Sequence, residues 1–225
     1  MTSLPRRALA EAFGTFGLIF FGCGAVVMNV APSANYGLLG IALVHGLVLS
    51  VMVTATMSTS GGHINPAVTA GLFTARRIDG RTALVYILAQ LVGAVLGALT
   101  LKALLPSGMT ELGTMGTPAL ANSVTLPQAI LIEAVLTFFL VSAVFGTAVA
   151  PDAPKVGGFA IGLVLFFDIL VGGPLTGAAM NPARAFGPAL VSGTWYAQLV
   201  WWAGPILGGI VAGVVWEWGI LGGKR

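Results

Sequence analysis

Apolar and polar positions divide the chain into six long apolar stretches that are separated by short polar segments. The stretches cover approximately residues 8–29, 38–58, 83–105, 128–149, 157–175 and 197–220. Each is close to the ~20 residues that an α-helix needs to cross the hydrocarbon core of a bilayer. The pattern therefore predicts an all-α membrane protein with six transmembrane helices.

Composition agrees with this prediction. Hydrophobic residues make up 57% of the 225 residues and charged residues only 8%, whereas roughly a quarter of the residues of a soluble domain are charged. The chain has room for six spans and short loops but not for a separate soluble domain. We therefore expect a single domain over residues 1–225.

The basic residues indicate how the spans are oriented. Most of them flank alternate ends of the apolar stretches: Arg6, Arg7, Arg76, Arg77, Arg81, Lys155, Lys224 and Arg225. Because loops rich in Lys and Arg stay in the cytoplasm, we expect both termini there, in a multi-pass protein of the cell membrane (plasma or inner). The bases are loop anchors and form no single face, so we expect no nucleic-acid partner.

Two related motifs lie between these apolar stretches: GGHINPAVTAG at residues 61–71 and GAAMNPARAFG at residues 177–187. Asn is a favoured N-cap, and Pro at the next position is preset for a helix. Each Asn-Pro-Ala therefore predicts a short helix, one from Asn65 to about Phe73 and one from Asn181 to about Leu190. A helix of ~10 residues spans only about half of the hydrocarbon core, so these are predicted to be re-entrant half-helices.

The two motifs lie in matching halves of the chain. Glu11-Ala-Phe-Gly-Thr-Phe in the first span corresponds to Glu133-Ala-Val-Leu-Thr-Phe in the fourth, and Gly-Leu-Val-Leu occurs at 46–49 and at 162–165. Three spans per half is an odd number, so the halves must have opposite orientations. We predict repeat 1 at about residues 6–105, a loop at about 106–126 and repeat 2 at about 127–221.

Inversion would bring the N-termini of the two half-helices together at the bilayer midplane. Their partial positive charges, ~0.5 each, oppose a cation there. Non-helical peptide is tolerated at this depth only where it lines a water-filled path. We therefore predict a pore for neutral solutes, with Asn65 and Asn181 as donors at its centre. Its lining backbone is expected at Gly61, Gly62, His63, Gly177 and Ala179.

These features resemble the aquaporin or major intrinsic protein family over essentially the whole chain. GGHINPAVT and MNPARAFGPAL are similar to the two signature loops of that family. The resemblance implies six tilted spans, two re-entrant half-helices, a homotetramer with one pore per subunit, and passage of water without protons or ions. The motif residues are Asn65, Pro66, Ala67, Asn181, Pro182 and Ala183.

The family narrows its pore near the outer end with four residues. Carried over to this chain, they are His45, Ile169, Ala178 and Arg184. This set resembles the filter of plant vacuolar-type (tonoplast intrinsic) members, several of which also conduct ammonia, urea or hydrogen peroxide. We therefore expect a similar solute range.

A facilitator of glycerol or metalloid hydroxides is the alternative function. Glycerol-type relatives carry Asp directly after the filter arginine and Lys four positions further on, where this chain has Ala185 and Ala189. A secondary transporter also has inverted repeats and broken helices, but the scarcity of charge disfavours a coupled carrier. An enzyme is disfavoured as well, because the sequence places no pair of carboxylates, and no nucleophile with a base, at the same depth in the membrane. We expect no catalytic residue, metal or cofactor.

Three carboxylates fall inside predicted spans. Glu11 and Glu133 occupy matched positions, and we expect them to accept hydrogen bonds from the two loops rather than to carry protons. Asp168 precedes Ile169 at a place where vacuolar-type relatives usually have Asn. Either it pairs with a donor in a loop, or it tunes Arg184 or His45 and so alters the choice of solute.

Overall fold

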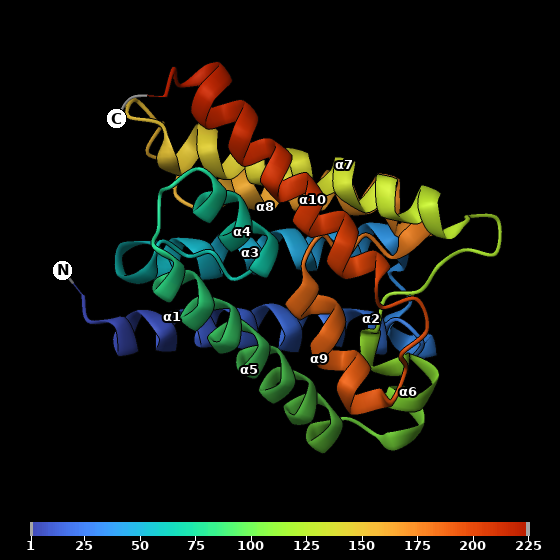
Figure 1. The fold of residues 1–225 in the computed structure, drawn as a ribbon. Helices are drawn as coiled ribbons and strands as arrows, with labels where there is room; N and C mark the ends of the chain where they lie inside the picture. Colours follow the sequence, from blue (N-terminus) through green and yellow to red (C-terminus); the bar gives the residue numbers. More distant parts are fainter. Residues whose placement is uncertain (1, 224–225) are drawn as a thin grey trace.

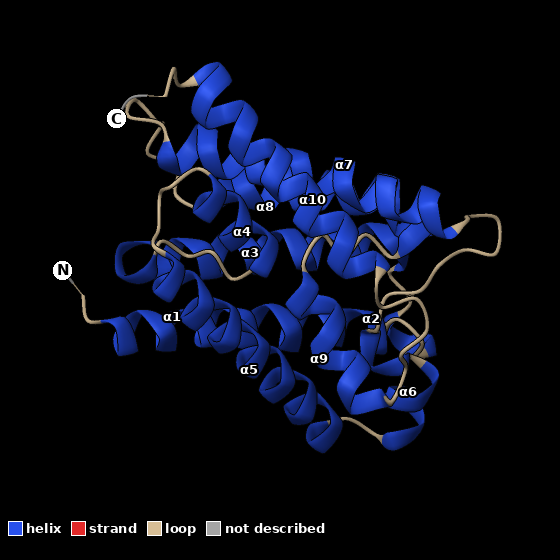
Figure 2. Cartoon of the chain, viewed as in Figure 1, coloured by secondary structure: helices blue, strands red, loops and turns tan. Residues whose placement is uncertain are grey.

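The computed structural model describes residues 2–223, which form helices and connecting loops without a β-strand in that range (Figures 1 and 2). Six helical segments are long and apolar enough to cross a membrane. They are α1–η1–α2 (Leu4–Met28), α3 (Gly37–Ser60), α5 (Gly80–Leu104), α7–η4 (Leu126–Val149), α8 (Phe159–Thr176) and α10–η5 (Val200–Ile220). The prediction of six spans is confirmed, and the largest shift is at the first span, which begins at Leu4 instead of residue 8.

Three of these spans change from α-helix to a π-helical turn along their length. The π-helical segments are η1 (Leu18–Cys23), η4 (Phe145–Val149) and η5 (Val215–Ile220), following or joining α1 (Leu4–Gly17), α2 (Gly24–Met28), α7 (Leu126–Val144) and α10 (Val200–Val214). Short elements occupy the loops: η2 (Pro32–Ala34), α6 (Ser107–Leu112) and η3 (Thr114–Gly116).

Local capping accounts for where several spans begin. Asp79 caps α5, accepting hydrogen bonds from the backbone N–H of Thr82 at 2.9 Å and from its hydroxyl at 2.6 Å. These bonds hold the pKa of the Asp79 carboxyl below its usual range. At the start of α7, Thr125 and Gln128 form a reciprocal capping box. The polar residues between apolar stretches therefore act as start signals for the helices that follow.

The two remaining helices are α4 (Pro66–Thr74) and α9 (Pro182–Ser192), the half-helices that the motifs predict. Both lie within the bundle, and they enter it from opposite ends (Figure 1). Each is capped by its motif asparagine, with the motif proline as the first helical residue. The expected re-entrant pair is confirmed.

Repeated glycines mark the place where the central spans cross. Gly46 of α3 and Gly162 of α8 face each other so closely that a Cβ added to Gly46 would lie 2.8 Å from the carbonyl oxygen of Gly162. A Cβ on Gly162 would likewise collide with the carbonyl of Gly46. Small residues at helix crossings let backbones approach within the membrane. The Gly-Leu-Val-Leu repeat therefore forms one of the contacts between the two halves.

A second pair of crossings is matched between the halves. Gly93 of α5 packs on the backbone of Ala12 in α1, and Gly208 of α10 packs on the backbone of Ala134 in α7. Ala12 and Ala134 each follow a buried glutamate, so both crossings hold a glutamate at the same place relative to its half. These equivalent contacts, together with the opposed half-helices, establish the inverted repeat.

The outer faces of the spans are apolar and exposed. On α3 the exposed positions recur every four residues: Leu39, Leu43, Leu47 and Val51. On α5 the corresponding row is Leu84, Leu88, Val92 and Leu96. Such faces can contact lipid or a second copy of the chain. Polar side chains instead gather inside the bundle, around the loops that lead into α4 and α9.

Candidate functional site

The motif asparagines join the two half-helices at the centre of the bundle. Asn65 Nδ2 donates to the backbone carbonyl of Met180 at 2.8 Å, and Asn181 Nδ2 donates to the carbonyl of Ile64 at 3.0 Å. Each acceptor immediately precedes the other asparagine in sequence. The bonds are therefore reciprocal, and they hold the N-termini of α4 and α9 against each other.

The oxygen of each amide caps its own half-helix. Asn65 Oδ1 accepts from Ala67 N at 2.7 Å, and Asn181 Oδ1 accepts from Ala183 N at 3.0 Å. Asn181 Oδ1 also lies 3.3 Å from the N–H of Arg184. Because the oxygen is engaged in this way, the NH₂ group must point away from the helix and towards the opposite loop. An amide NH₂ has two donors, so one N–H per asparagine remains after the crossing bond.

Each motif is preceded by a loop with the same unusual backbone. Residues four, three and one positions before the asparagine have positive φ angles. The angles are 95°, 63° and 56° at Gly61, Gly62 and Ile64, and 76°, 43° and 51° at Gly177, Ala178 and Met180. Residues with a Cβ rarely adopt such angles, so other groups must hold these loops in place.

Glu11 braces the first loop. Its Oε1 accepts from the hydroxyl of Ser60 at 2.6 Å and from His63 N at 3.0 Å, and its Oε2 accepts from Ile64 N at 2.6 Å. Gln90 Nε2 donates to the same Oε2 at 2.8 Å. The carboxylate is fully buried, and all of these contacts come from donors, as a buried anion requires.

Glu133 makes the equivalent contacts in the second half. Its Oε1 accepts from the hydroxyl of Thr176 at 2.7 Å and from Ala179 N at 3.0 Å. Its Oε2 accepts from Met180 N at 2.7 Å. The hydroxyl residues had not been singled out from sequence, although Ser60 and Thr176 each lie five positions before a motif asparagine.

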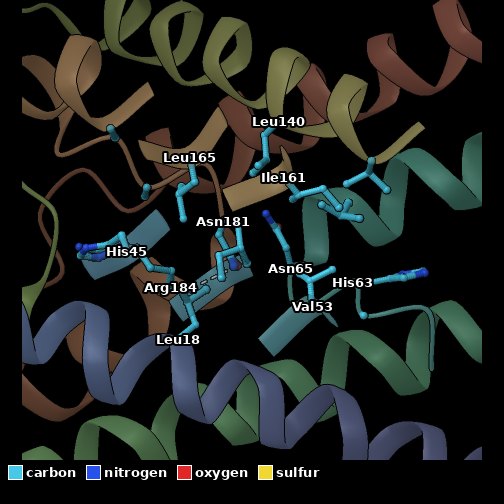
Figure 3. Close-up of a pocket in the computed structure, with 16 residues that line it drawn as sticks. Leu18, His45, Val53, His63, Asn65, Leu140, Ile161, Leu165, Asn181 and Arg184 are labelled. Atoms are coloured by element: carbon cyan, nitrogen blue, oxygen red, sulfur yellow. Dashed lines mark hydrogen bonds between the residues drawn. The ribbon is translucent and has the colours of Figure 1, made fainter. Parts of the chain in front are cut away.

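A narrow cavity runs past the two asparagines (Figure 3). Its volume is about 20 Å³, which is room for about one water molecule. The lining combines polar groups, from both loops, His45 and Arg184, with aliphatic side chains. The aliphatic side chains are Leu18, Leu49, Val53, Val68, Leu140, Val144, Ile161 and Leu165.

A wider cavity of about 230 Å³ lies at the end of the bundle where α3 begins. It is lined by Ile169, Gly177 and residues 116–119, among others. His45 and Arg184 line both this cavity and the narrow one. The two side chains therefore form the neck between the cavities, with Ile169 on the wide side and Ala178 on the narrow side.

Arg184 is buried at this neck, and its Nη1 donates to the backbone carbonyl of Gly116 at 2.8 Å. No carboxylate within residues 2–223 forms an ion pair with it. A buried arginine at membrane depth is costly unless it faces water or polar partners. The remaining donors of its planar guanidinium are therefore available to a solute at the neck.

His45 lines the same neck beside Arg184. Its Nδ1 lies 2.9 Å from the carbonyl oxygen of Ile41. Because a carbonyl oxygen only accepts, Nδ1 carries the proton of the neutral ring, and Nε2 has a free lone pair. Nε2 is buried without a hydrogen-bond partner in the described chain. Because Nε2 packs against Gly22 of η1, the neck presents donors on Arg184 beside the buried ring of His45.

Asp168 differs from one of the two expectations. It is buried in α8 but forms no ion pair with Arg184, and within residues 2–223 its Oδ2 has no hydrogen-bond partner. It lines neither cavity, whereas its neighbour Ile169 does. The helical step of about 100° per residue turns the two side chains to different faces of α8. Asp168 therefore forms no ion pair with the neck arginine, and its tuning of Arg184 or His45 stays a prediction.

Comparison with known proteins agrees with this geometry. Residues 1–216 match the family model described as Major intrinsic protein. The chain belongs to the major intrinsic protein family. The X-ray structure of the aquaglyceroporin from Plasmodium falciparum, at 25% identity, covers 97% of each chain with a TM-score of 0.85. The resemblance and the fold class predicted from sequence are confirmed.

Plant members of the family are more similar in sequence. Aquaporin TIP4-4 of Zea mays is 43% identical in an alignment of 222 positions that covers 94% of this chain and 85% of the relative. Probable aquaporin TIP3-2 of Arabidopsis thaliana is 39% identical in an alignment of 229 positions that covers 96% of this chain and 84% of the relative. These tonoplast-type names do not support the expected location in the cell membrane. The comparisons support the broader conclusion that the chain is an integral, multi-pass membrane protein.

Gly116 contributes to the neck, although the sequence by itself does not predict this. The carbonyl of Gly116 binds Arg184 because Thr114, Met115 and Gly116 all have positive φ, at 44°, 55° and 73°. A Cβ on Gly116 would lie 2.7 Å from the Cβ of Cys23. The glycine in a long loop was the available signal, but nothing local connects it to an arginine that lies 68 residues away.

Proposed function

We propose that this protein is a passive transmembrane channel for water. Small neutral solutes such as ammonia, urea and hydrogen peroxide pass through it as well, and protons and ions are excluded. The proposal is carried by the reciprocal bonds between the two asparagines and the opposite loops, beside a cavity that has room for about one water molecule. It describes a channel and not an enzyme.

Water passes the centre by exchanging hydrogen bonds with a strip of polar groups. The remaining N–H of Asn65 and of Asn181 donates a hydrogen bond to the oxygen of a passing water. The O–H groups of that water donate hydrogen bonds to loop carbonyls at Gly61, Gly62, His63, Gly177 and Ala179. The aliphatic side chains that line the cavity offer no competing hydrogen-bond partner. A water that accepts two bonds from the asparagines cannot also accept from the next water, so the proton relay is broken there.

Cations are opposed by fixed positive charge along the same path. The N-termini of α4 and α9 contribute ~0.5 charge each at the centre, and Arg184 adds a full charge at the neck. An ion would also have to lose its hydration shell in a cavity of about 20 Å³. Neutral dipoles avoid both costs, because they replace bonds to water with bonds to the protein.

The neck sets the solute range. Arg184 donates to a solute such as urea through the guanidinium N–H groups that its bond to Gly116 leaves free, and the ring of His45 limits the width of the neck. Ile169 and Ala178 complete the selectivity filter as apolar walls. A glycerol facilitator remains the alternative, and it is supported by the likeness to an aquaglyceroporin structure. We favour the first reading because the apolar part of the neck has no aromatic side chain for a carbon backbone.

Orientation and assembly complete the proposal. We place both termini in the cytoplasm, since the basic residues Arg7, Arg76, Arg77 and Lys155 accompany the end of the bundle where α1 begins. We also propose a homotetramer with one pore per subunit, in which some of the exposed apolar rows of the spans contact neighbouring subunits. The repeat boundaries and the bracing roles of Glu11 and Glu133 belong to the same proposal.

Stopped-flow light scattering on proteoliposomes tests this function. We expect water flux that does not saturate, depends weakly on temperature and greatly exceeds that of empty liposomes. Urea, ammonia and glycerol are measured on the same preparation, and glycerol is expected to pass far more slowly than water. Uptake that saturates and requires an ion gradient would indicate a carrier instead. Potassium passing as readily as water would refute the channel mechanism.

Arg184→Ala is the matched variant. Removing the guanidinium widens the neck and deletes its positive charge, so we expect the ratio of urea to water permeability to rise several-fold. Glu111→Gln, on the exposed helix α6, serves as the control and should leave this ratio unchanged. An unchanged ratio in Arg184→Ala would remove Arg184 from the filter without removing the channel.

A further inference from the structure

A basic cavity lies at the end of the bundle where α1 begins. The helix η5 ends at the same end of the bundle (Figure 1). The cavity has a volume of about 840 Å³, and it lies between the first turn of α1 and the connection from α4 to α5. The lining consists of Arg7, Phe73, Thr74, Arg76, Arg77, Ile78 and Asp79. This cavity is separate from the path past the asparagines, and the proposed channel mechanism makes no use of it.

Three arginines and a single acidic residue line this cavity. The carboxylate of that acidic residue, Asp79, already accepts two hydrogen bonds from Thr82. Arg77 forms an ion pair with Glu217 of η5 at 2.7 Å, the one ion pair within residues 2–223. Arg7 and Arg76 have no acidic partner in that range. The cavity therefore has an excess of positive charge.

Two of the arginines are held in place by the fold. Arg7 Nε donates to the hydroxyl of Tyr86 at 2.7 Å, and its guanidinium lies 5.2 Å from the centre of that ring. Arg76 has φ 57° at the end of α4, in the left-handed conformation that usually belongs to glycine. The positive-inside rule explains why basic residues occur at this end. It does not explain why they converge on one cavity.

The surroundings place this cavity at the depth of lipid headgroups. An adjoining cavity of about 600 Å³ shares Arg76 and Arg77 and is also lined by Trp218. Trp218 is exposed, and exposed tryptophans at helix ends favour the membrane–water interface. Phe73 is 50% exposed on the cavity wall, next to the arginines. Apolar and cationic groups thus meet at one level, as a phospholipid requires.

We propose that this cavity binds the headgroup of an anionic phospholipid. Guanidinium groups match the geometry of a phosphate and bind it through paired hydrogen bonds. Basic pockets between spans on the cytoplasmic side, where the leaflet is anionic, suit such headgroups. The phosphate is held by Arg7 and Arg76, Arg77 remains paired with Glu217, and Phe73 contacts the start of the acyl chains. This site goes beyond the channel function and does not depend on it.

Native mass spectrometry of the purified full-length protein tests the site. Phosphatidylglycerol and phosphatidylcholine with identical acyl chains are titrated separately, and inorganic phosphate forms a third arm. We expect wild-type protein to bind phosphatidylglycerol more tightly than phosphatidylcholine. Arg76→Gln should lower the affinity for phosphatidylglycerol about fivefold, the effect of one basic residue near an anionic lipid surface. Lys102→Gln, which removes one charge at the opposite end of α5, should leave it unchanged.

A second variant, Arg76→Gly, separates the loss of lipid binding from a loss of folding. Glycine accepts the left-handed backbone at this position, so the variant deletes the side chain while preserving the end of α4. It should lose as much phosphatidylglycerol affinity as Arg76→Gln and still unfold at the wild-type temperature. Equal affinity of wild type for both lipids, or an equal loss in Lys102→Gln, would overturn the proposal. So would inorganic phosphate that competes at the site while phosphatidylglycerol does not.

Discussion

In each motif asparagine, one amide group has two structural roles. Its oxygen caps a half-helix and its nitrogen bonds to the loop that precedes the other half-helix. The two roles are coupled, because rotating the amide to break the crossing bond would also remove the cap. The direction of the remaining N–H donors is therefore set by four hydrogen bonds rather than by the side-chain torsions alone.

The buried glutamates extend this control to the loops. Glu133→Gln replaces one acceptor oxygen with a donor group, among contacts that all come from donors. At least one buried donor then loses its partner, at a cost of about 1–3 kcal/mol. We expect the temperature of thermal unfolding in detergent to fall by roughly 2–12 °C, together with a lower water permeability.

The exposed variant Glu111→Gln is again the control, because it changes the same chemical group on the surface of α6. A Glu133→Gln protein that unfolds at the wild-type temperature would argue against bracing by this residue. Glu11→Gln provides an independent repeat of the test in the other half, since Glu11 accepts four such bonds.

Among the helices, the half-helices depend on the crossings of the full spans. α4 packs against α10, and α9 packs against α5. The crossing of α10 with α7 is made close by Gly208, and that of α5 with α1 by Gly93. These glycines therefore set the spacing of the spans against which the half-helices pack.

Gly208→Ala tests this dependence. The added methyl group would collide with the backbone carbonyl of Ala134, which cannot move without shifting α7. Overpacking of this kind costs about 1–3 kcal/mol, so we expect a lower unfolding temperature and reduced water flux. Gly219→Ala, where a Cβ would meet no atom within 4 Å, is the control. If the two variants behaved alike, close approach at Gly208 would not matter for stability.

At the scale of the whole molecule, the two ends of the bundle differ in charge. Arg7, Arg76 and Arg77 lie at the end where α1 begins, whereas Lys102 lies near the other end of α5. A protein with this asymmetry should insert in one orientation, with the basic end in the cytoplasm.

Cysteine labelling in spheroplasts of an expressing bacterium checks the orientation. Asn122→Cys lies in the loop between α6 and α7, and Lys155→Cys lies between η4 and α8. A membrane-impermeant maleimide should label Asn122→Cys in intact spheroplasts and Lys155→Cys only after lysis. Wild type is the control, since Cys23 is buried. The reverse labelling pattern would show that the orientation is wrong.

Much of this architecture could be predicted along the chain. The spans follow from the length of the apolar stretches, and the half-helices follow from Asn-Pro, because burial in lipid and helix capping are properties of neighbouring residues. The surroundings of Asp168 are harder to predict in this way. It adjoins Ile169 in sequence, but consecutive residues of a helix face different directions, and Asp168 forms no ion pair with Arg184.

Spans, half-helices, inverted orientation and family membership were therefore already present in the amino-acid order. The contacts that shape the path were not, because they join distant parts of the chain: Asn65 with Met180 across 115 residues, and Arg184 with Gly116 across 68. Such pairs depend on how the helices register against one another. That register is set by close glycine crossings in three dimensions, which is also why the arginines around the basic cavity came together only in the folded protein.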